Sequence, residues 1–294
     1  PGYFLYEPSP QPPVTYLLLR GSPSSPGDKV DPAVPTALVK KQPTFLAPDA
    51  FTSRRRLSLA RWITDPNNPL TARVAVNRYW QMYFGIGIVK TAEDFGSQGE
   101  WPTHPELLDW LAVEFMDSGW NVRHMVKLLV MTNAYRRSSA STPEQRRLDA
   151  ENALFVRQSS FRLDAELVRD NALAISGLLS RKIGGRSVKP YQPTNYWYRL
   201  YKEGKYEQDH GEDLYRRGLY TYWRRSYWHP SLQAFDAPAR EECVAERPRS
   251  NTPQQSLVLL NDPTYVEAAR VFATNLTRDG GTTRERLSLA FRTA

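Results

Sequence analysis

Residues 103–136 read THPELLDWLAVEFMDSGWNVRHMVKLLVMTNAYR, and this stretch decides the fold class. Its apolar residues recur at helical spacing on both sides of the pair Ser118 and Gly119. Thr103 and Glu106 have the spacing of a capping box, and Asn121 is a typical residue to begin a helix. The stretch therefore predicts two helices, joined by a short glycine turn, that form an antiparallel hairpin.

Helical patterns continue on both sides of this stretch. They predict helices before Asp65, from Pro69 to Phe84, over a short segment after Pro143, and over 164–179. A last helical hairpin is expected over 252–294, with a break near Gly281. The prediction is a mainly α protein, a multi-helix bundle with orthogonal or antiparallel packing.

The chain divides by composition into four segments that we expect to form one domain. These are an extended proline-rich arm that packs on the core (1–52), a helical core (53–185), an irregular insertion rich in aromatic and basic residues (186–250) and a C-terminal helical hairpin (251–294). The chain begins without a methionine and stops inside a helical pattern, so we expect it to be a fragment of a longer protein.

Composition excludes several classes of protein. No apolar run approaches the roughly 20 residues that span a bilayer. The single cysteine excludes an internal disulfide, a haem-attachment motif and a cysteine-rich zinc site. The net charge of +8 is compatible with nucleic-acid binding, but basic and acidic residues alternate along the helices, which is typical of solvated surface. Nucleic acid is therefore not the expected partner.

The irregular insertion is the candidate binding surface, because twelve aromatic residues lie between Tyr191 and Trp228 among several arginines. Indole and phenol rings offer flat faces to sugar rings or to bases, and guanidinium groups pair with carboxylates or phosphates. The same aromatic residues can equally hold an irregular segment onto a core. The residues of this candidate surface are Trp197, Tyr198, Arg217, Trp223, Arg224, Arg225 and Trp228.

A second candidate is a cluster of polar residues in predicted helices and at their ends. Asn77 and Arg78 follow one another in mid-helix, and if they point inward they need partners, for which acids near Asp170 are available. A histidine at a helix N-terminus, such as His104, is favoured in its neutral form. Either a buried network that locks helices together or a substrate pocket explains the pattern. The candidate cluster comprises Asn77, Arg78, His104, Asp170, Asp236 and Arg240.

Two further features have simpler interpretations. The acidic run over 207–213 offers oxygen ligands for a hard cation, but it lacks the spacing of an EF-hand loop, so we expect a solvated loop and no metal site. Cys243 lies between acidic residues and arginines that give no clear push toward the thiolate. We expect it to be a small buried residue at the entry to the last hairpin.

The order of several short motifs resembles a planctomycete-specific C-terminal domain of unknown function, number fifteen fifty-three. The motifs are 56–62, 68–74, Asn77-Arg78, 94–96, 102–111, Gly119-Trp120, 217–225, 235–238, Arg240-Glu241, Cys243, 251–253 and 259–263. The resemblance implies a large exported protein of Planctomycetes and an extracytoplasmic location. It also implies upstream domains of the same polypeptide as partners, one of them often a cytochrome c domain that carries haem. It transfers no catalytic residue.

Two functions compete at this point. The first is an accessory or binding domain that docks the cytochrome c domain of its parent, needs no cofactor of its own and has a polysaccharide as its candidate ligand. The second is a carbohydrate-active enzyme, oxidative or hydrolytic, in which acids such as Asp109, Asp170, Asp236 or Glu241 transfer protons. Whether the domain is an enzyme stays open, since the chain lacks the known nucleotide-binding, metalloprotease and serine-hydrolase motifs.

Overall fold

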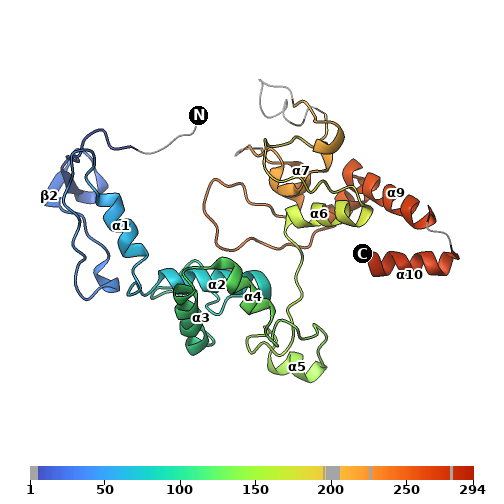
Figure 1. Ribbon diagram of the computed structural model, residues 1–294, viewed down its shortest axis with the longest axis horizontal. Helices are drawn as coiled ribbons and strands as arrows, with labels where there is room; N and C mark the ends of the chain where they lie inside the picture. The colour runs from blue at the N-terminus through green and yellow to red at the C-terminus, as the bar shows by residue number, and fades with distance from the viewer. Residues whose placement is uncertain (1–5, 195, 197–205, 225–226, 279–280) are drawn as a thin grey trace. The chain divides into compact units, whose positions relative to one another are not determined.

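The computed structural model describes residues 6–194, 196, 206–224, 227–278 and 281–294 (Figure 1). Helices dominate this part of the chain, which confirms the mainly α prediction. The strands are β1 (Thr15–Leu18) and β2 (Pro26–Val30). The α-helices are α1 (Arg55–Ile63), α2 (Thr71–Phe84), α3 (Pro105–Asp117), α4 (Val122–Val130), α5 (Pro143–Leu148), α6 (Ala165–Ser176), α7 (Pro230–Ala234), α8 (Pro253–Asn261), α9 (Pro263–Arg278) and α10 (Thr283–Thr293).

The chain forms two compact units, Pro1–Ser160 and Phe161–Ala294, which we describe separately as unit 1 and unit 2. The helical core predicted over 53–185 crosses this division. The reason is that α6 buries Ala165 and Leu173 within unit 2, where it packs against α7 and α9. The apolar surface of a helix belongs to whichever neighbour covers it, and sequence proximity does not decide this.

Unit 1 is built around α2, which packs against both α3 and α4. The buried side chains of α2 that face these helices include Val76, Trp80 and Phe84. The rings of Trp80 and Phe84 stack with their centroids 4.0 Å apart. The two helices predicted over 103–136 are confirmed as α3 and α4, and a contact of 2.6 Å between Glu114 Oε1 and His124 Nε2 links them.

The start of α3 differs from the predicted capping box. His104, not Thr103, is the residue before the helix, and no side chain caps it. Thr103 is turned away because its backbone N–H and its hydroxyl both donate to the carbonyl of Ile88, at 2.9 and 3.3 Å. The predicted cap of α4 is confirmed, since Asn121 Oδ1 accepts from the N–H of His124.

The N-terminal arm contains a small antiparallel sheet of β1 and β2, whose residues are almost all exposed. Other parts of the arm bind the start of α1. The carboxylate of Glu7 accepts from the N–H of Ser53 at 2.6 Å, and Ser58 Oγ accepts from the N–H of Leu46 at 2.9 Å. Hydrogen bonds of this kind hold the arm against α1.

Unit 2 has its own apolar core, made by Ala165, Leu232, Phe235 and Ala237. The C-terminal segment, predicted as a hairpin of two helices, forms three helices. α8 ends at Asn261 and α9 begins at Pro263, because proline has no N–H to continue a helix and suits the first turn of a new one. A capping box between Thr282 and Glu285 begins α10.

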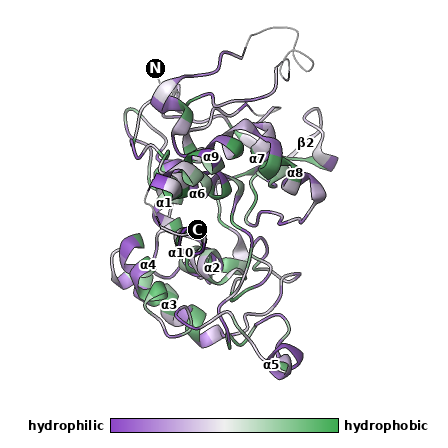
Figure 2. Cartoon of the chain, turned by 90° about the vertical axis from the view of Figure 1, so that its right-hand side faces the viewer, coloured by the Kyte–Doolittle hydropathy of each residue, from purple (hydrophilic) through white to green (hydrophobic). Residues whose placement is uncertain are grey.

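The short helix α5 is polar and lies at the surface. It has no buried residue, and Figure 2 colours it as mostly hydrophilic. Across the described ranges, no helix is both long and apolar enough to span a bilayer.

Candidate functional site

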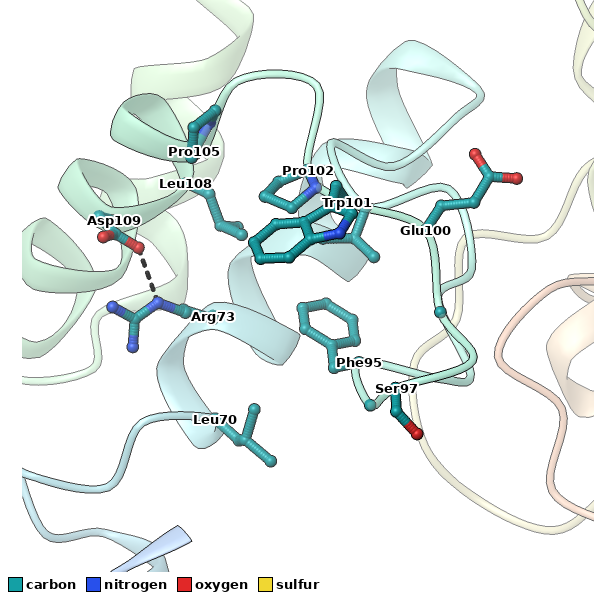
Figure 3. A pocket seen from close by; sticks show the side chains of 13 residues that line it. Leu70, Arg73, Phe95, Ser97, Glu100, Trp101, Pro102, Pro105, Leu108 and Asp109 are labelled. Carbon is teal, nitrogen blue, oxygen red and sulfur yellow. Dashed lines mark hydrogen bonds and ion pairs between the residues drawn. The ribbon is translucent and has the colours of Figure 1, made fainter. Parts of the chain in front are cut away.

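Unit 1 contains a pocket of about 320 Å³ at the start of α2 and α3, where the connection between these helices folds over them (Figure 3). This volume is at the small end of the range of about 300–1,000 Å³ that is typical of ligand pockets. Its lining residues are Leu70, Arg73, Val89, Phe95, Gly96, Ser97, Gly99, Glu100, Trp101, Pro102, Pro105, Leu108 and Asp109.

The loop 91–100 closes one side of the pocket and holds its own shape. Thr91 Oγ1 donates to the carbonyl of Asp94 and accepts from the N–H of Glu100, both at 2.9 Å. Asp94 Oδ1 accepts from the N–H of Gly96 at 2.6 Å. A Cβ atom at Gly99 would lie 2.1 Å from the carbonyl oxygen of Asp94, so only glycine fits there. The loop 91–100 is therefore held in this conformation by its own hydrogen bonds, without a ligand.

An aromatic wall faces the pocket, and its main member is Trp101, whose residue surface is 92% exposed. In Figure 3 the Trp101 ring, the Phe95 ring and the Leu70 side chain surround the same space, with Pro102 beside the indole. An exposed indole at a pocket is unusual, because burial of its large apolar surface is favourable. This wall offers a flat apolar face to a ligand.

A polar wall completes the pocket and consists of Arg73 and Asp109. Arg73 Nε donates to Asp109 Oδ1 at 2.7 Å, and Arg73 Nη1 donates to the carbonyl of Pro69 at 2.6 Å. The side chains of Glu100 and Ser97 are directed away from the pocket (Figure 3). The only charged side chains that face the space in this view are thus one cation and one anion that pair with each other.

Asn77 supports the pocket from behind. Its fully buried side chain donates to the carbonyl of Val89 at 3.0 Å and accepts from the N–H of Val89 at 2.9 Å, and Val89 lines the pocket. The preceding loop passes so close that a Cβ at Gly87 would lie 2.7 Å from Asn77 Nδ2. The sequence offered acids near Asp170 as available partners if Asn77 pointed inward, whereas its partner in the structure is the backbone of Val89.

The other members of the candidate polar cluster that lie in unit 1 do not line the pocket. Arg78 is exposed on α2. One ring nitrogen of His104 lies 3.0 Å from Thr103 Oγ1, and its ring centroid lies 5.4 Å from that of Phe155. His104 precedes the pocket residue Pro105, so it forms part of the structure beside the pocket.

The remaining cluster members, Asp170, Asp236 and Arg240, lie in unit 2. Asp236 accepts from Arg162 Nη2 at 2.5 Å and from the N–H and hydroxyl of Ser250, both at 2.8 Å. Its backbone has a φ of 63°, a left-handed conformation that Asp and Asn tolerate better than other non-glycine residues. These bonds tie the segment before α6 to the segment before α8.

Asp170 belongs to a buried polar core of unit 2. Asp170 Oδ1 accepts from the N–H of Gly218 at 2.6 Å, and burial raises the pKa of this carboxyl. The neighbouring Arg169 is buried and donates from Nη1 to the carbonyl of Arg216 and from Nη2 to that of Leu214, both at 2.6 Å. Burial lowers the pKa of Arg169, and the nearby charge of Asp170 opposes that effect. Both side chains hold the irregular segment onto α6.

His229 is a buried titratable residue that the sequence did not single out. Burial lowers its pKa to about 4. Nε2 lies 2.6 Å from the carbonyl of Tyr191, which can only accept, so Nε2 carries the proton. The residue is a neutral donor that fixes the loop at 191.

The candidate binding surface of 191–228 is only partly described. Trp197, Tyr198 and Arg225 lie outside the described residues. Trp223 and Trp228 pack against the apolar core of unit 2. The guanidinium carbon of Arg240 lies 3.8 Å from the centroid of the Trp223 ring and so covers one face of that indole.

The two arginines of this surface that the structure describes are Arg217 and Arg224. Arg217 is exposed, and Arg224 is half-buried. The structure thus gives Trp223 and Trp228 the packing role that was the alternative in the sequence.

The acidic run and Cys243 also lie in the part of the chain that the structure describes. Asp209 and Asp213 pair with Arg186 at 2.7 and 3.2 Å, and Glu212 accepts from Ser180 Oγ at 2.6 Å. Within the described ranges, no group of three His, Cys, Asp or Glu residues could hold a metal ion. Cys243 is exposed, so the prediction that it is buried was wrong. The irregular segment before α8 lies at the surface there and packs through other residues.

Sequence reasoning missed the pocket as a unit, although it named three residues in or beside it: Asn77, His104 and Asp109. The available signal was the sequence GSQGEWP over 96–102, which places a tryptophan after two glycines and before a proline. A tryptophan in so polar a loop has no core to join, which is the pattern of a binding residue.

Comparison with known proteins gave one family. The family model described as "Protein of unknown function (DUF1553)" matches residues 55–294. The curated proteins and the solved structures gave no match. The matched region contains the whole pocket, while the N-terminal arm precedes it.

Proposed function

The chain belongs to this DUF1553 family of proteins of unknown function, and we propose that it acts as a binding module whose pocket in unit 1 takes a sugar residue of a glycan. The observation that carries the proposal is the 92% exposed Trp101 at the wall of a pocket that also presents a polar pair.

The two walls of the pocket suit the two kinds of surface on a sugar. The face of a pyranose ring is made of C–H groups, which pack well on an indole ring. The hydroxyl groups at the edge of the ring need donors and acceptors, and Arg73 and Asp109 supply both. A purely apolar ligand would form no hydrogen bond with the polar pair, whereas an anionic ligand would gain little from the electron-rich face of the Trp101 indole.

The same geometry favours binding over glycoside hydrolysis. A hydrolase normally needs two carboxyl groups on either side of the scissile bond. Of the two carboxylates at this pocket, Asp109 is bound by Arg73 and Glu100 is directed away from the space. The enzyme alternative therefore has less support at this site.

The other parts of the functional prediction rest on the family resemblance alone. Docking to a haem-bearing cytochrome c domain, an origin in Planctomycetes and an extracytoplasmic location remain proposals. If the extracytoplasmic location is right, the glycan of the proposed function is a polysaccharide of a cell surface.

The experiment is a glycan-array screen of the whole chain, followed by calorimetry with the sugars that bind. Trp101→Ala should abolish binding. Trp110→Ala is the matched control, since Trp110 is 51% exposed on α3 and does not line the pocket. Absence of any bound glycan, or equal binding by Trp101→Ala, would contradict the proposed function.

A further inference from the structure

The polar wall of the pocket has a specific hydrogen-bonding capacity that is left unused. Arg73 uses Nε for Asp109 and Nη1 for Pro69, while Asp109 uses Oδ1 for Arg73. Among the described residues, no partner is found for Arg73 Nη2 or for Asp109 Oδ2. The pair therefore offers one donor and one acceptor close together.

This arrangement matches two adjacent hydroxyl groups on one sugar ring. Each hydroxyl both donates and accepts, so one can donate to Asp109 Oδ2 while its neighbour accepts from Arg73 Nη2. Hydrogen bonds to charged groups are stronger than those between neutral groups, and both positions are already fixed by the ion pair. The loss of side-chain freedom on binding is accordingly small.

The charge of the pocket also selects among sugars. Among the described residues that line the pocket, Arg73 is the only basic one, and its charge is compensated by Asp109 at 2.7 Å. A uronic acid or a sulfated sugar would bring a negative charge to this wall without an unpaired cation to meet it. Placing an unpaired charge in a partly desolvated site is unfavourable.

We propose that the pocket selects uncharged sugars, and that the Arg73–Asp109 pair reads two adjacent hydroxyl groups of the ring. This inference rests on the proposed function, because it specifies which sugars the Trp101 wall accepts.

The test uses pairs of sugars that differ only at C6. The probes are the methyl glycosides of glucose, galactose and mannose, each with its methyl uronide, and binding to the whole chain is followed by saturation-transfer NMR with titration. The neutral member of at least one pair should bind about tenfold more tightly than its uronide. In Asp109→Asn this preference should shrink or reverse, because the charge of Arg73 then becomes available to the carboxylate.

Asp117→Asn is the matched control, since Asp117 is exposed on the same helix and does not line the pocket. It should keep the preference of the unmodified chain. Circular dichroism of both variants checks that they are folded.

The outcomes separate this inference from the proposed function. If no glycoside or uronide binds, or if binding does not depend on Trp101, the proposed function fails and this inference fails with it. If Trp101-dependent binding is present but the uronide binds as tightly as the neutral sugar, or Asp109→Asn leaves the preference unchanged, only the inference on selectivity is overturned.

Discussion

Asn77 holds Val89 by two hydrogen bonds, one to its carbonyl at 3.0 Å and one from its N–H at 2.9 Å. This side chain on α2 thus satisfies both backbone groups of a residue in the pocket wall. A backbone group that is buried without a partner is destabilising, so the pair fixes the path of the chain between α2 and the loop 91–100.

Asn77→Ala should therefore reduce the free energy of unfolding by about 2–4 kcal/mol, because it leaves two buried backbone groups without partners. Urea denaturation measures the change. The control is Asn133→Ala, which alters an exposed asparagine of unit 1 and should stay within about 0.5 kcal/mol of the unmodified chain. Equal effects of the two substitutions would show that Asn77 does not support the wall.

His229 should make unit 2 less stable in acid. Its folded pKa of about 4 lies below the ordinary value of about 6.5, so between these values the unfolded chain binds the proton and the folded chain does not. The contribution of His229 to the free energy of unfolding is fully present above pH 6.5. It is lost as the pH falls toward 4, and the total loss is about 3 kcal/mol.

The measurement is the free energy of unfolding between pH 4 and 7 for the unmodified chain and for His229→Gln, whose amide can still donate to Tyr191. The difference between the two proteins separates His229 from carboxyl groups that titrate in the same range. His210→Gln, at an exposed position, should keep the slope of the unmodified chain. If the free energy of unfolding of His229→Gln depends on pH as it does in the unmodified chain, the pH dependence belongs to another group.

Gly99→Ala should disrupt the pocket wall, because its Cβ would lie 2.1 Å from the carbonyl oxygen of Asp94. The loop must move to relieve this contact, so glycan affinity should fall by at least about tenfold. Ser97→Ala on the same loop should leave affinity nearly unchanged, because the serine hydroxyl is directed away from the pocket. Isothermal titration calorimetry measures the glycan affinity of both variants. Unchanged affinity in Gly99→Ala would argue against a pocket wall whose conformation is fixed without ligand.

Asp236 should tolerate asparagine better than alanine. Asparagine keeps the left-handed backbone and part of the hydrogen bonding to Ser250, whereas alanine loses both and leaves Arg162 without its carboxylate. We expect a loss of about 1–2 kcal/mol for Asp236→Asn and about 3–4 kcal/mol for Asp236→Ala. Thermal denaturation with Glu242→Ala as an exposed control tests this order, and a reversed order would remove the structural role of Asp236.

Cys243 should react with a thiol reagent in the folded protein. Because the residue is exposed, Ellman's reagent should modify one thiol per chain without denaturant, at a rate close to that in urea. Protection that is lifted only by unfolding would restore the original prediction of a buried residue.

Local signals in the sequence predicted the local structure well. The 3.6-residue apolar period identified α2, α3, α4 and α6, and the side-chain cap at Asn121 was read correctly. Such signals act within one or two helical turns, so the sequence contains them in full. Pro263 is a local signal of the same kind that the prediction overlooked, so the last segment was predicted as two helices but forms three.

Signals that depend on distant partners could not be read in the same way. Thr103 had the spacing of a capping residue but binds Ile88. The sequence was equally compatible with binding and with packing for Trp223, and in the structure this residue packs under Arg240. The role of each side chain depends on which backbone or ring lies opposite it after folding. The sequence does not contain that information locally.

The sequence by itself determined that this chain is mainly helical, that it belongs to a family recognisable by ordered motifs, and that one cysteine limits its chemistry. Only the tertiary structure revealed the pocket that we propose as the binding site. It left Trp101 exposed beside the Arg73–Asp109 pair and turned the aromatic residues Trp223 and Trp228 into packing groups of unit 2. The physical reason is that an aromatic residue serves binding only if folding leaves its face uncovered.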